Sequence, residues 1–265
     1  MTNLLPLIPY PLQTAAAVML GLALGSFANV CIHRLPKDES VVFPRSYCPA
    51  CNSRVRGWDN IPVVSYILLG GKCRDCKEPI SKRYPAIEIV TASLIALGFF
   101  RFGVSWEFLI FVVLGPALVI ITVIDLEHQI IPDIITLPGI VFGLAAGSYM
   151  VGWMDSLFGL LLGGGLFYLI ADIYYRLRNT MGMGGGDIKY IAAAGALLGW
   201  KKVLLAIFIG AFLGAIVGLA GMIDKKLNYL SKIPFGPFLA AGTLISFFSG
   251  DRIIYLYLIA MGLRI

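Results

Sequence analysis

The chain has 265 residues, of which 58% are hydrophobic and only 14% are charged, and its mean hydropathy is +0.86. In a soluble domain, about a quarter of all residues are normally charged. Here, apolar runs close to the roughly 20 residues that cross a bilayer recur from end to end. This composition excludes an ordinary soluble protein and predicts a polytopic membrane protein in contact with the lipid bilayer.

The formal net charge of +6 is concentrated in residues 32–85, which contain ten Lys/Arg against five acidic residues. By the positive-inside rule this loop lies in the cytoplasm and the N-terminus lies outside. The first 31 residues contain no Lys or Arg, so the run 12–31 is expected to be a retained helix rather than a cleaved signal peptide. A basic segment is also typical of nucleic-acid binding, but the flanking spans account for the charge and no nucleic acid is expected.

The apolar runs predict an all-α fold of about eight transmembrane helices, with both termini outside. The expected spans are 12–31, 86–103, 106–124, 134–153, 156–175, 188–200, 203–223 and 235–250. Residues 253–264 extend the last helix or lie along the membrane interface. The loops 32–85, 125–133, 176–187 and 224–234 then face the cytoplasm. Lys201 and Lys202 fall on the outer side, against the rule.

This pattern divides the chain into a first helix (1–31), a small cytoplasmic domain (32–85) and a transmembrane domain (86–265). Glycines recur at four-residue spacing within 139–147 and within 210–218. Small residues at this spacing allow membrane helices to approach closely. Helix packing is therefore the expected role of these glycines.

Four of the five cysteines form two C-x-x-C pairs separated by twenty-one residues: Cys48, Cys51, Cys73 and Cys76. Each pair can place two thiolates on one tetrahedral ion, so the two pairs predict a structural Zn²⁺ site with a closed shell. Such an ion would stabilise a loop that has little apolar core of its own. The alternative is a redox pair or four unrelated thiols. Cys31, at the end of the first span, is expected to be a buried side chain rather than a ligand.

Two carboxylates stand at the expected cytoplasmic ends of different spans. Asp125 follows the apolar run "ALVIITVI", and Asp187 opens "IKYIAAAGALLG". Acidic residues at the ends of membrane helices are functional candidates, and a pair of them can act as base and acid on a peptide bond. Asp133, which follows Pro132, instead suits the N-cap of the next helix.

A glycine run, Gly184 to Gly186, precedes Asp187 in "MGMGGGDIKY". The run does not have the spacing of a phosphate-binding loop. Without Cβ atoms, it allows close approach of a substrate backbone to the carboxylate. Lys189 either acts on Asp187 or reaches the interface as a solvated charge.

Together these segments resemble the bifunctional prepilin peptidases, which belong to the G-x-G-D intramembrane aspartic proteases. The resemblance rests on "GMGGGDIK" and "DLEHQIIPD", and on "GSFANVCIHRLP", "PRSYCPACN", "IPVVSY" and "CRDCKEPISKRYPAIE". It covers most of the chain in order, and the tail after about residue 235 adds little to it.

The resemblance implies a protein of the bacterial cytoplasmic (inner) membrane with both active sites facing the cytoplasm. Such enzymes remove the basic leader of type IV prepilins or type II secretion pseudopilins, typically after a glycine. They then methylate the new N-terminal amine using S-adenosylmethionine. Carried over, Asp125 and Asp187 are the catalytic pair, and the four paired cysteines bind zinc.

The methyltransferase site is expected among polar residues at the membrane junctions of the cytoplasmic loop. The candidates are Asn29, Arg34 and Glu88. A carboxylate at Glu88 could hold the substrate amine, or it could stabilise the first turn of its own helix.

Two functions of other classes stay open from the residues alone. One is an ion- or proton-coupled transporter that uses the membrane aspartates. The other is a membrane-anchored binding module whose zinc loop recruits a partner, with structural aspartates.

Overall fold

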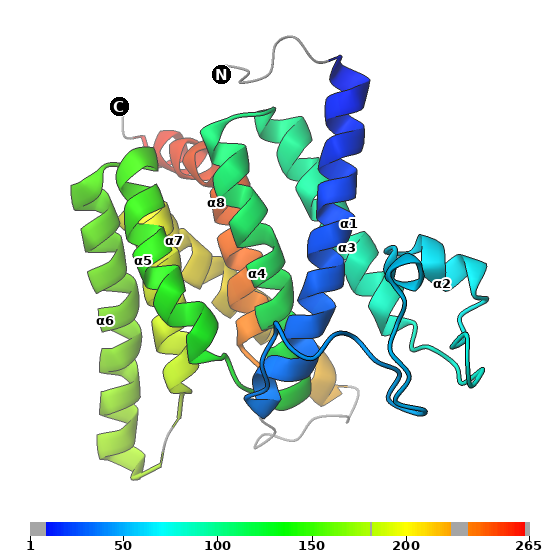
Figure 1. Cartoon of the computed structure of the whole chain (residues 1–265). Helices are drawn as coiled ribbons and strands as arrows, with labels where there is room; N and C mark the ends of the chain where they lie inside the picture. Colours follow the sequence, from blue (N-terminus) through cyan, green and yellow to red (C-terminus); the bar gives the residue numbers. More distant parts are fainter. Residues whose placement is uncertain (1–8, 181, 224–232, 263–265) are drawn as a thin grey trace. The chain divides into compact units, whose positions relative to one another are not determined.

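A computed structural model describes residues 9–180, 182–223 and 233–262 (Figure 1). The chain divides into two compact units, Met1–Ile120 and Ile121–Ile265. The regular secondary structure of the described residues is helical, and pairing between extended segments is confined to two isolated β-bridges. The expected loop 224–234, with Lys225, Lys226 and Lys232, lies almost entirely outside the described residues.

Seven helices in the described part of the chain are long and apolar enough to cross a membrane. They are α1 Tyr10–Arg34, α3 Arg83–Phe102, α4 Trp106–His128, α5 Asp133–Met150, α6 Trp153–Arg178, α7 Gly185–Ile223 and α8 Gly236–Ala260. The all-α polytopic fold is confirmed. Residues 253–260 extend the last helix, which is one of the two alternatives expected for that segment.

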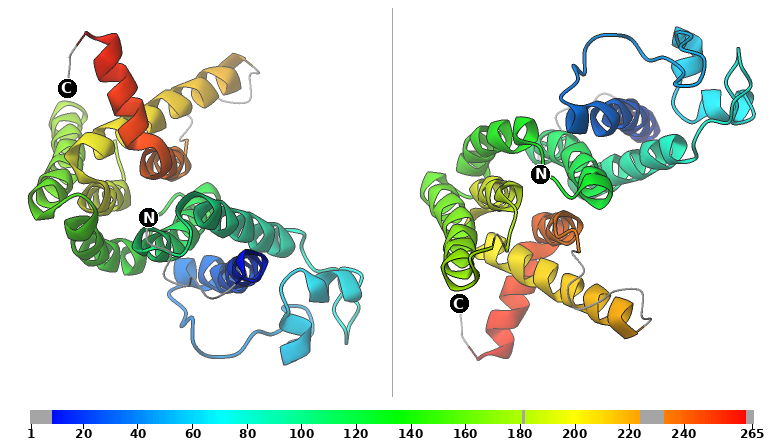
Figure 2. Two further views of the ribbon diagram at one scale, coloured as in Figure 1. Left: turned by 90° about the horizontal axis from the view of Figure 1, so that it is seen from above. Right: turned by 90° about the horizontal axis from the view of Figure 1, so that it is seen from below.

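Helix α7 joins two of the expected spans. It contains two helices that meet at Gly199, whose φ of 77° and ψ of 167° are not helical. A positive φ combined with ψ near 180° is essentially restricted to glycine, so this residue permits the change of direction seen in Figure 2. The expected spans 188–200 and 203–223 therefore correspond to the two parts of α7. Counting α7 once gives seven helices, and counting its parts gives the eight expected.

In the first unit, α1 and α3 pack side by side because glycine removes the side chains between them (Figure 1). A Cβ added to Gly21 would lie 2.6 Å from Cα of Ala92, and one added to Gly25 would lie 2.6 Å from Cα of Glu88. The loop between these helices carries three short helices: η1 Leu35–Lys37, η2 Gly57–Asn60 and α2 Val64–Leu68.

In the second unit, α7 is central and is contacted by α5, α6 and α8. Glycines line these contacts, as expected for 139–147 and 210–218. Gly143 and Gly147 of α5 face the α7 backbone, and Gly210 of α7 faces the carbonyl oxygen of Phe238 in α8. A further crossing, absent from the sequence prediction, brings Gly159 of α6 against α7. Close backbone approach thus positions α7, the helix that carries Asp187, among α5, α6 and α8.

Two glycines of α5 provide a matched test of this packing. A Cβ at Gly147 would overlap the carbonyl oxygen of Ala196, whereas one at Gly139 would make an ordinary 3.6 Å contact with Cβ of Ala193. We expect Gly147→Ala to destabilise the protein by about 1–3 kcal/mol, as overpacking does. Gly139→Ala should be neutral or slightly stabilising, because alanine favours helix. Thermal unfolding in detergent measures both, and equal midpoints would contradict the packing assignment.

Lys202, one of the two lysines that fall on the outer side of the predicted topology, forms an ion pair. Lys202 Nζ lies 2.7 Å from Oδ2 of Asp251 in α8, and the lysine side chain is only 14% exposed. This pair neutralises a charge close to the kink in α7. Large apolar side chains instead point outward, among them Val141, Leu161 and Phe208. Outward apolar side chains on long helices are typical of lipid-facing surfaces.

Candidate active site and metal centre

The two C-x-x-C segments fold into similar turns. In the first, Asn52 N–H donates to the carbonyl of Cys48, and Tyr47 pairs with Arg54 in a β-bridge. In the second, Lys77 N–H donates to the carbonyl of Cys73, with a bridge between residues 72 and 79. Asn52 and Lys77 both have positive φ, 57° and 64°. Each turn therefore presents two sulfur atoms from one compact loop.

The four sulfur atoms lie within 4.8 Å of one another, and Sγ of Cys48 is 3.8 Å from Sγ of Cys76. Zinc–sulfur bonds of about 2.3 Å in a tetrahedron place sulfur atoms roughly 3.8 Å apart. The cluster therefore has the ligand number and spacing to hold a metal ion, as the sequence predicted. Cys31 lies apart, buried in α1, and its expected structural role is consistent with this position.

Hydrogen bonds prepare part of the cluster for metal binding. The hydroxyl and backbone of Ser53 lower the pKa of Cys51 to about 6, and the backbone N–H groups of Cys76 and Asp75 lower the pKa of Cys73. The backbone of Glu78 lowers the pKa of Cys76, but burial and the neighbouring sulfur atoms outweigh it and raise that pKa to about 12. Thiolates are the metal-binding form, and a cation is needed for all four to coexist.

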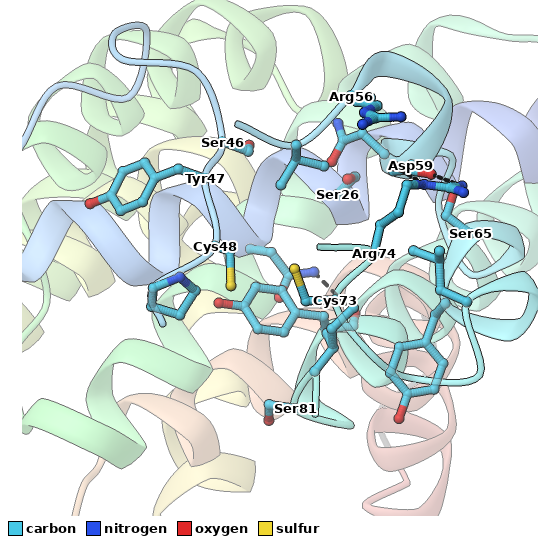
Figure 3. Close-up of a pocket in the computed structure, with 18 of the residues that line it drawn as sticks. Ser26, Ser46, Tyr47, Cys48, Arg56, Asp59, Ser65, Cys73, Arg74 and Ser81 are labelled. Atoms are coloured by element: carbon cyan, nitrogen blue, oxygen red, sulfur yellow. Dashed lines mark hydrogen bonds and ion pairs between the residues drawn. The ribbon is translucent and has the colours of Figure 1, made fainter. Parts of the chain in front are cut away.

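A cavity of about 420 Å³ lies between the cysteine turns and the adjacent ends of α1 and α3 (Figure 3). Its size falls within the range of small-molecule sites. Arg74 from the second cysteine turn bonds Asp59 of η2 through two contacts of 2.6 and 2.8 Å. This hydrogen-bonded pair lowers the pKa of Asp59 and ties the second cysteine turn to η2, which also lines the cavity.

The three residues expected in a methyltransferase site all line this cavity: Asn29, Arg34 and Glu88. Arg34 donates to the carbonyls of Ser40 and Pro44, at 2.8 and 2.6 Å, so its guanidinium holds the loop. Asn29 is 4% exposed and donates through Nδ2 to the carbonyl of Tyr84. Its Oδ1 is buried and accepts no hydrogen bond among the described residues. That oxygen is an acceptor available to a ligand.

Glu88 supports an unusual turn in the cavity wall. Its Oε2 accepts the N–H of Val63 at 2.7 Å, and the residue is 8% exposed. Val63 has φ 61° and ψ −48°, and the next N–H donates to the carbonyl of Pro62 at 2.6 Å. A β-branched residue with positive φ is strained, and strained turns cluster at functional sites. The sequence gives no sign of this turn, because valine does not favour it.

In the second unit, Asp125 is 5% exposed near the end of α4. Its Oδ2 accepts the backbone N–H of Gly236 at 2.7 Å, at the first residue of α8. Asp187 lies in the first turn of α7, close enough for an electrostatic interaction with Asp125. Its Oδ1 is buried and accepts no hydrogen bond within the part of the chain that the structure describes. The two predicted carboxylates are thus brought together.

The three glycines before Asp187 have different surroundings. A Cβ at Gly184 would lie 3.4 Å from Oδ2 of Asp187, and one at Gly185 would meet nothing within 4 Å. A Cβ at Gly186 would lie 2.9 Å from Cβ of Ile131. Glycine is therefore required at 186 by the packing of the chain itself, whereas 184 and 185 leave open space beside the carboxylate.

The partner of Lys189 is Asp133 and not Asp187. Its Nζ bonds both carboxylate oxygens of Asp133, at 2.7 and 2.8 Å. The N-cap prediction for Asp133 is wrong, because Pro132 occupies the N-cap and Asp133 makes no capping hydrogen bond. Both side chains are half exposed, so the pair contributes at most about 1 kcal/mol. It joins the starts of α5 and α7 beside the Asp187 segment.

Gly236 was not expected at the site from the sequence, because the tail after about residue 235 adds little to the family resemblance. A signal was nevertheless present in "IPFGP", residues 233–237, where proline and glycine stand together directly before an apolar run. Such a segment is typical of a helix start. Its link to Asp125, 111 residues earlier, depends on the tertiary fold.

The fold and these two sites define a polytopic helical membrane protein with paired aspartates and a four-cysteine centre. The model described as the bacterial peptidase A24 N-terminal domain matches residues 19–102, and that of the type IV leader peptidase family matches 109–219. A protein of Pseudomonas aeruginosa named prepilin leader peptidase/N-methyltransferase is 34% identical, covering 98% of this chain and 100% of that protein.

Other relatives with the same name agree. That of Burkholderia pseudomallei is 37% identical over 92% of this chain and 87% of its own length. That of Neisseria gonorrhoeae is 35% identical over 96% of both. No solved structure gives a significant match. The chain belongs to the prepilin leader peptidase/N-methyltransferase family.

Proposed function

We propose that this protein removes the basic leader from type IV prepilins or type II secretion pseudopilins and then methylates the new N-terminal amine. The observation that carries the proposal is the meeting of Asp125 and Asp187 in one unit of a chain related to such enzymes over nearly its whole length. Family relatives offer no support for a transporter.

Peptide hydrolysis follows from two neighbouring carboxyl groups that share one proton. The ionised carboxylate removes a proton from water, and the hydroxide oxygen bonds to the carbonyl carbon of the scissile peptide. The protonated carboxyl gives its proton to the carbonyl oxygen. When the tetrahedral intermediate collapses, the C–N bond breaks, the nitrogen takes a proton from the first carboxyl, and a hydroxyl of the intermediate returns a proton to the second. Asp125 and Asp187 supply both groups.

Substrate access fits the open space beside Asp187. A prepilin has an apolar helix after its leader, and such a helix can enter laterally from the bilayer. An extended peptide then approaches Gly184 and Gly185, where a Cβ at 185 would meet nothing within 4 Å. Gly186 and Lys189 support this segment through Ile131 and Asp133. The cleavage site would lie at the membrane surface. The positive-inside rule, applied to the basic loop 32–85, would place it on the cytoplasmic side.

For methylation, we assign the cavity in the first unit. S-adenosylmethionine supplies an electrophilic methyl group when bound. The buried Oδ1 of Asn29 would accept an N–H from a ligand, and the carboxylate of Glu88 would hold the substrate amine and take the proton that the amine must lose to become a nucleophile. Arg34 keeps the loop 40–44 in place through its two carbonyl contacts. The cysteine turns, with zinc as the structural ion, would hold the cavity's other side.

The domains expected from the sequence would divide the two activities between them. Residues 32–85, between the first helix 1–31 and the transmembrane part, would form the zinc-stabilised methyltransferase domain together with the adjacent ends of α1 and α3. Residues 86–265 would form the peptidase domain. Both active sites would face the cytoplasm of the bacterial inner membrane, because the basic loop precedes α3 and the aspartates lie at helix ends on the same predicted side.

Replacement of Glu88 should separate the two activities. Glu88→Gln keeps the shape and an acceptor for Val63 N–H but removes the negative charge that would hold the amine. We expect methyl transfer to a cleaved pilin to fall by about 10²-fold or more, while leader cleavage stays within about twofold. Glu39→Gln, at an exposed position of the loop between α1 and α3, is the control. Equal methyl transfer by wild type and Glu88→Gln would exclude this role.

The function itself is tested with purified protein in detergent and a prepilin substrate. Leader removal is followed by gel and by mass. Cleavage by the wild type supports the proposal, whereas substrate-dependent ion flux in liposomes without any proteolysis would favour the transporter.

A further inference from the structure

The first turn of α8 makes a buried hydrogen bond with Asp125. The N–H of Gly236 donates to Oδ2 of Asp125 at 2.7 Å. Amide groups at the start of a helix have no partner within the helix, and the carboxylate supplies one. We propose, on the basis of the function proposed above, that Gly236 is a positioning residue of the peptidase. Its N–H donates to Oδ2 of Asp125 and leaves Oδ1 as the oxygen that exchanges a proton with the catalytic water.

The need for glycine at position 236 arises from this contact. A Cβ there would lie 2.8 Å from Oδ2, 3.1 Å from Cγ and 3.2 Å from Cβ of Asp125. Gly236 is not among the residues with positive φ, so backbone conformation does not require glycine. Any side chain would therefore displace the carboxylate. A catalytic group misplaced by about 1 Å can cost about 10²-fold in rate.

The first half of α8 is anchored to the helix that carries Asp187. Tyr190, one turn after Asp187, donates its hydroxyl proton to Oγ1 of Thr243 at 2.8 Å. Tyr190 is 4% exposed and Thr243 is fully buried. The ring of Phe235 stacks on Phe167 of α6 with centroids 6.3 Å apart. These contacts fix where α8 begins, and hence where the Gly236 N–H points.

A chain of contacts therefore links the two carboxylates. Asp187 and Tyr190 share one face of α7, because residues three apart are neighbours on a helix. Tyr190 bonds Thr243, and Thr243 lies two turns after Gly236 in α8. Gly236 bonds Asp125. The position of one catalytic carboxylate is thus set by the helix that carries the other, and a shift of α8 would misplace the pair.

The test compares Gly236→Ala with Gly250→Ala, a second buried glycine of α8. The atoms nearest to a Cβ added at Gly250 belong to the flexible Lys202 side chain, at 3.2 Å. We expect Gly236→Ala to lower kcat for prepilin cleavage by about 10²-fold or more, with KM within about threefold and an altered pH profile of kcat. Methylation of an already cleaved pilin should equal that of the wild type. Gly250→Ala should cleave normally.

The outcomes separate this proposal from the function on which it rests. If wild type cleaves and Gly236→Ala has the same kcat and pH profile, the positioning role is excluded while the peptidase assignment stands. If Gly250→Ala loses kcat as much as Gly236→Ala, the effect belongs to helix packing and the proposal is also wrong. A wild type that cleaves no prepilin overturns the proposed function, and this inference with it.

A second pair of variants keeps the proposal testable if Gly236→Ala does not fold. Tyr190→Phe and Thr243→Val each remove the hydrogen bond between Tyr190 and Thr243, which is the shorter of the two contacts from the Tyr190 hydroxyl to α8. Each should lower kcat by about 3- to 30-fold, and the double variant should be no slower than the slower single one, because both remove one interaction. Independent, multiplying effects, or no effect of either variant, would contradict the proposal.

Discussion

Asparagine in place of Asp125 or Asp187 is expected to reduce leader cleavage by about 10³-fold or more, since each carboxyl serves as base or acid in the same step. Asparagine keeps the size of the side chain and can still accept the Gly236 N–H at position 125, but it cannot take a proton from water. The double variant should be no slower than the single ones, because the two groups act together.

The matched control for these variants is Asp172→Asn. Asp172 pairs with Arg176 at 2.7 Å on an exposed face of α6, so its carboxylate serves the helix surface only. Its replacement should leave cleavage unchanged. All three variants should still methylate an already cleaved pilin, which shows that the protein is folded. Normal cleavage by Asp125→Asn and Asp187→Asn would exclude the assigned pair.

Replacement of a cysteine in the cluster is expected to have a large effect on the zinc content and on the stability of the cytoplasmic loop. Purified protein should contain about one zinc ion per chain, held by four thiolates. Cys48→Ser and Cys73→Ser should each lower that content to near zero, because each removes a ligand from a different turn. Structural zinc contributes about 10 kcal/mol or more of apparent binding free energy in small domains, so the loop 32–85 should then become sensitive to proteolysis.

Cys31→Ala serves as the control for this experiment, because Cys31 is buried in α1 outside the cluster. Metal analysis and limited proteolysis provide the measurements. Treatment with a strong chelator should reproduce the effect of the ligand variants. Methyl transfer should fall with the metal, since the cysteine turns line the cavity. A metal-free protein with full methyl transfer and an intact loop would rule out a structural zinc.

Local patterns in the sequence were sufficient to predict most of the helices. Apolar runs located every long helix that the structure describes, because each must supply enough consecutive apolar residues to cross a bilayer. The cysteine spacing correctly indicated one cluster, since each C-x-x-C turn is a local structure. The sequence also predicted the break in α7, between the expected spans 188–200 and 203–223, but it did not show that the two parts are joined directly at Gly199 without a loop.

Partners distant in the sequence were harder to predict. Asp133 follows a proline at a helix start, which is typical of an N-cap, yet its carboxylate bonds Lys189 of α7. Asp125 lies at the wrong end of its own helix for capping, yet it accepts an N–H from the start of α8. In both cases the carboxylate bonds a group on another helix. A single sequence does not show which helices are neighbours, so these partners could not be predicted.

The methyltransferase candidates were predicted only in part: their common location was predicted, but their contacts were not. Asn29, Arg34 and Glu88 were selected for their position at the membrane junctions, and all three line one cavity. Their contacts differ, however. Arg34 holds loop carbonyls, whereas Glu88 supports the strained turn at Val63. Position along the chain predicted which residues meet, but only the fold gives each one its partner.

The most direct test of the account is to incubate the purified wild-type protein with a prepilin and S-adenosylmethionine, and to measure the mass of the product and of its N-terminal peptide. We expect a pilin that has lost its basic leader at one peptide bond and whose new N-terminal residue is heavier by one methyl group. Intact prepilin after incubation with folded, zinc-containing protein would contradict the central claim.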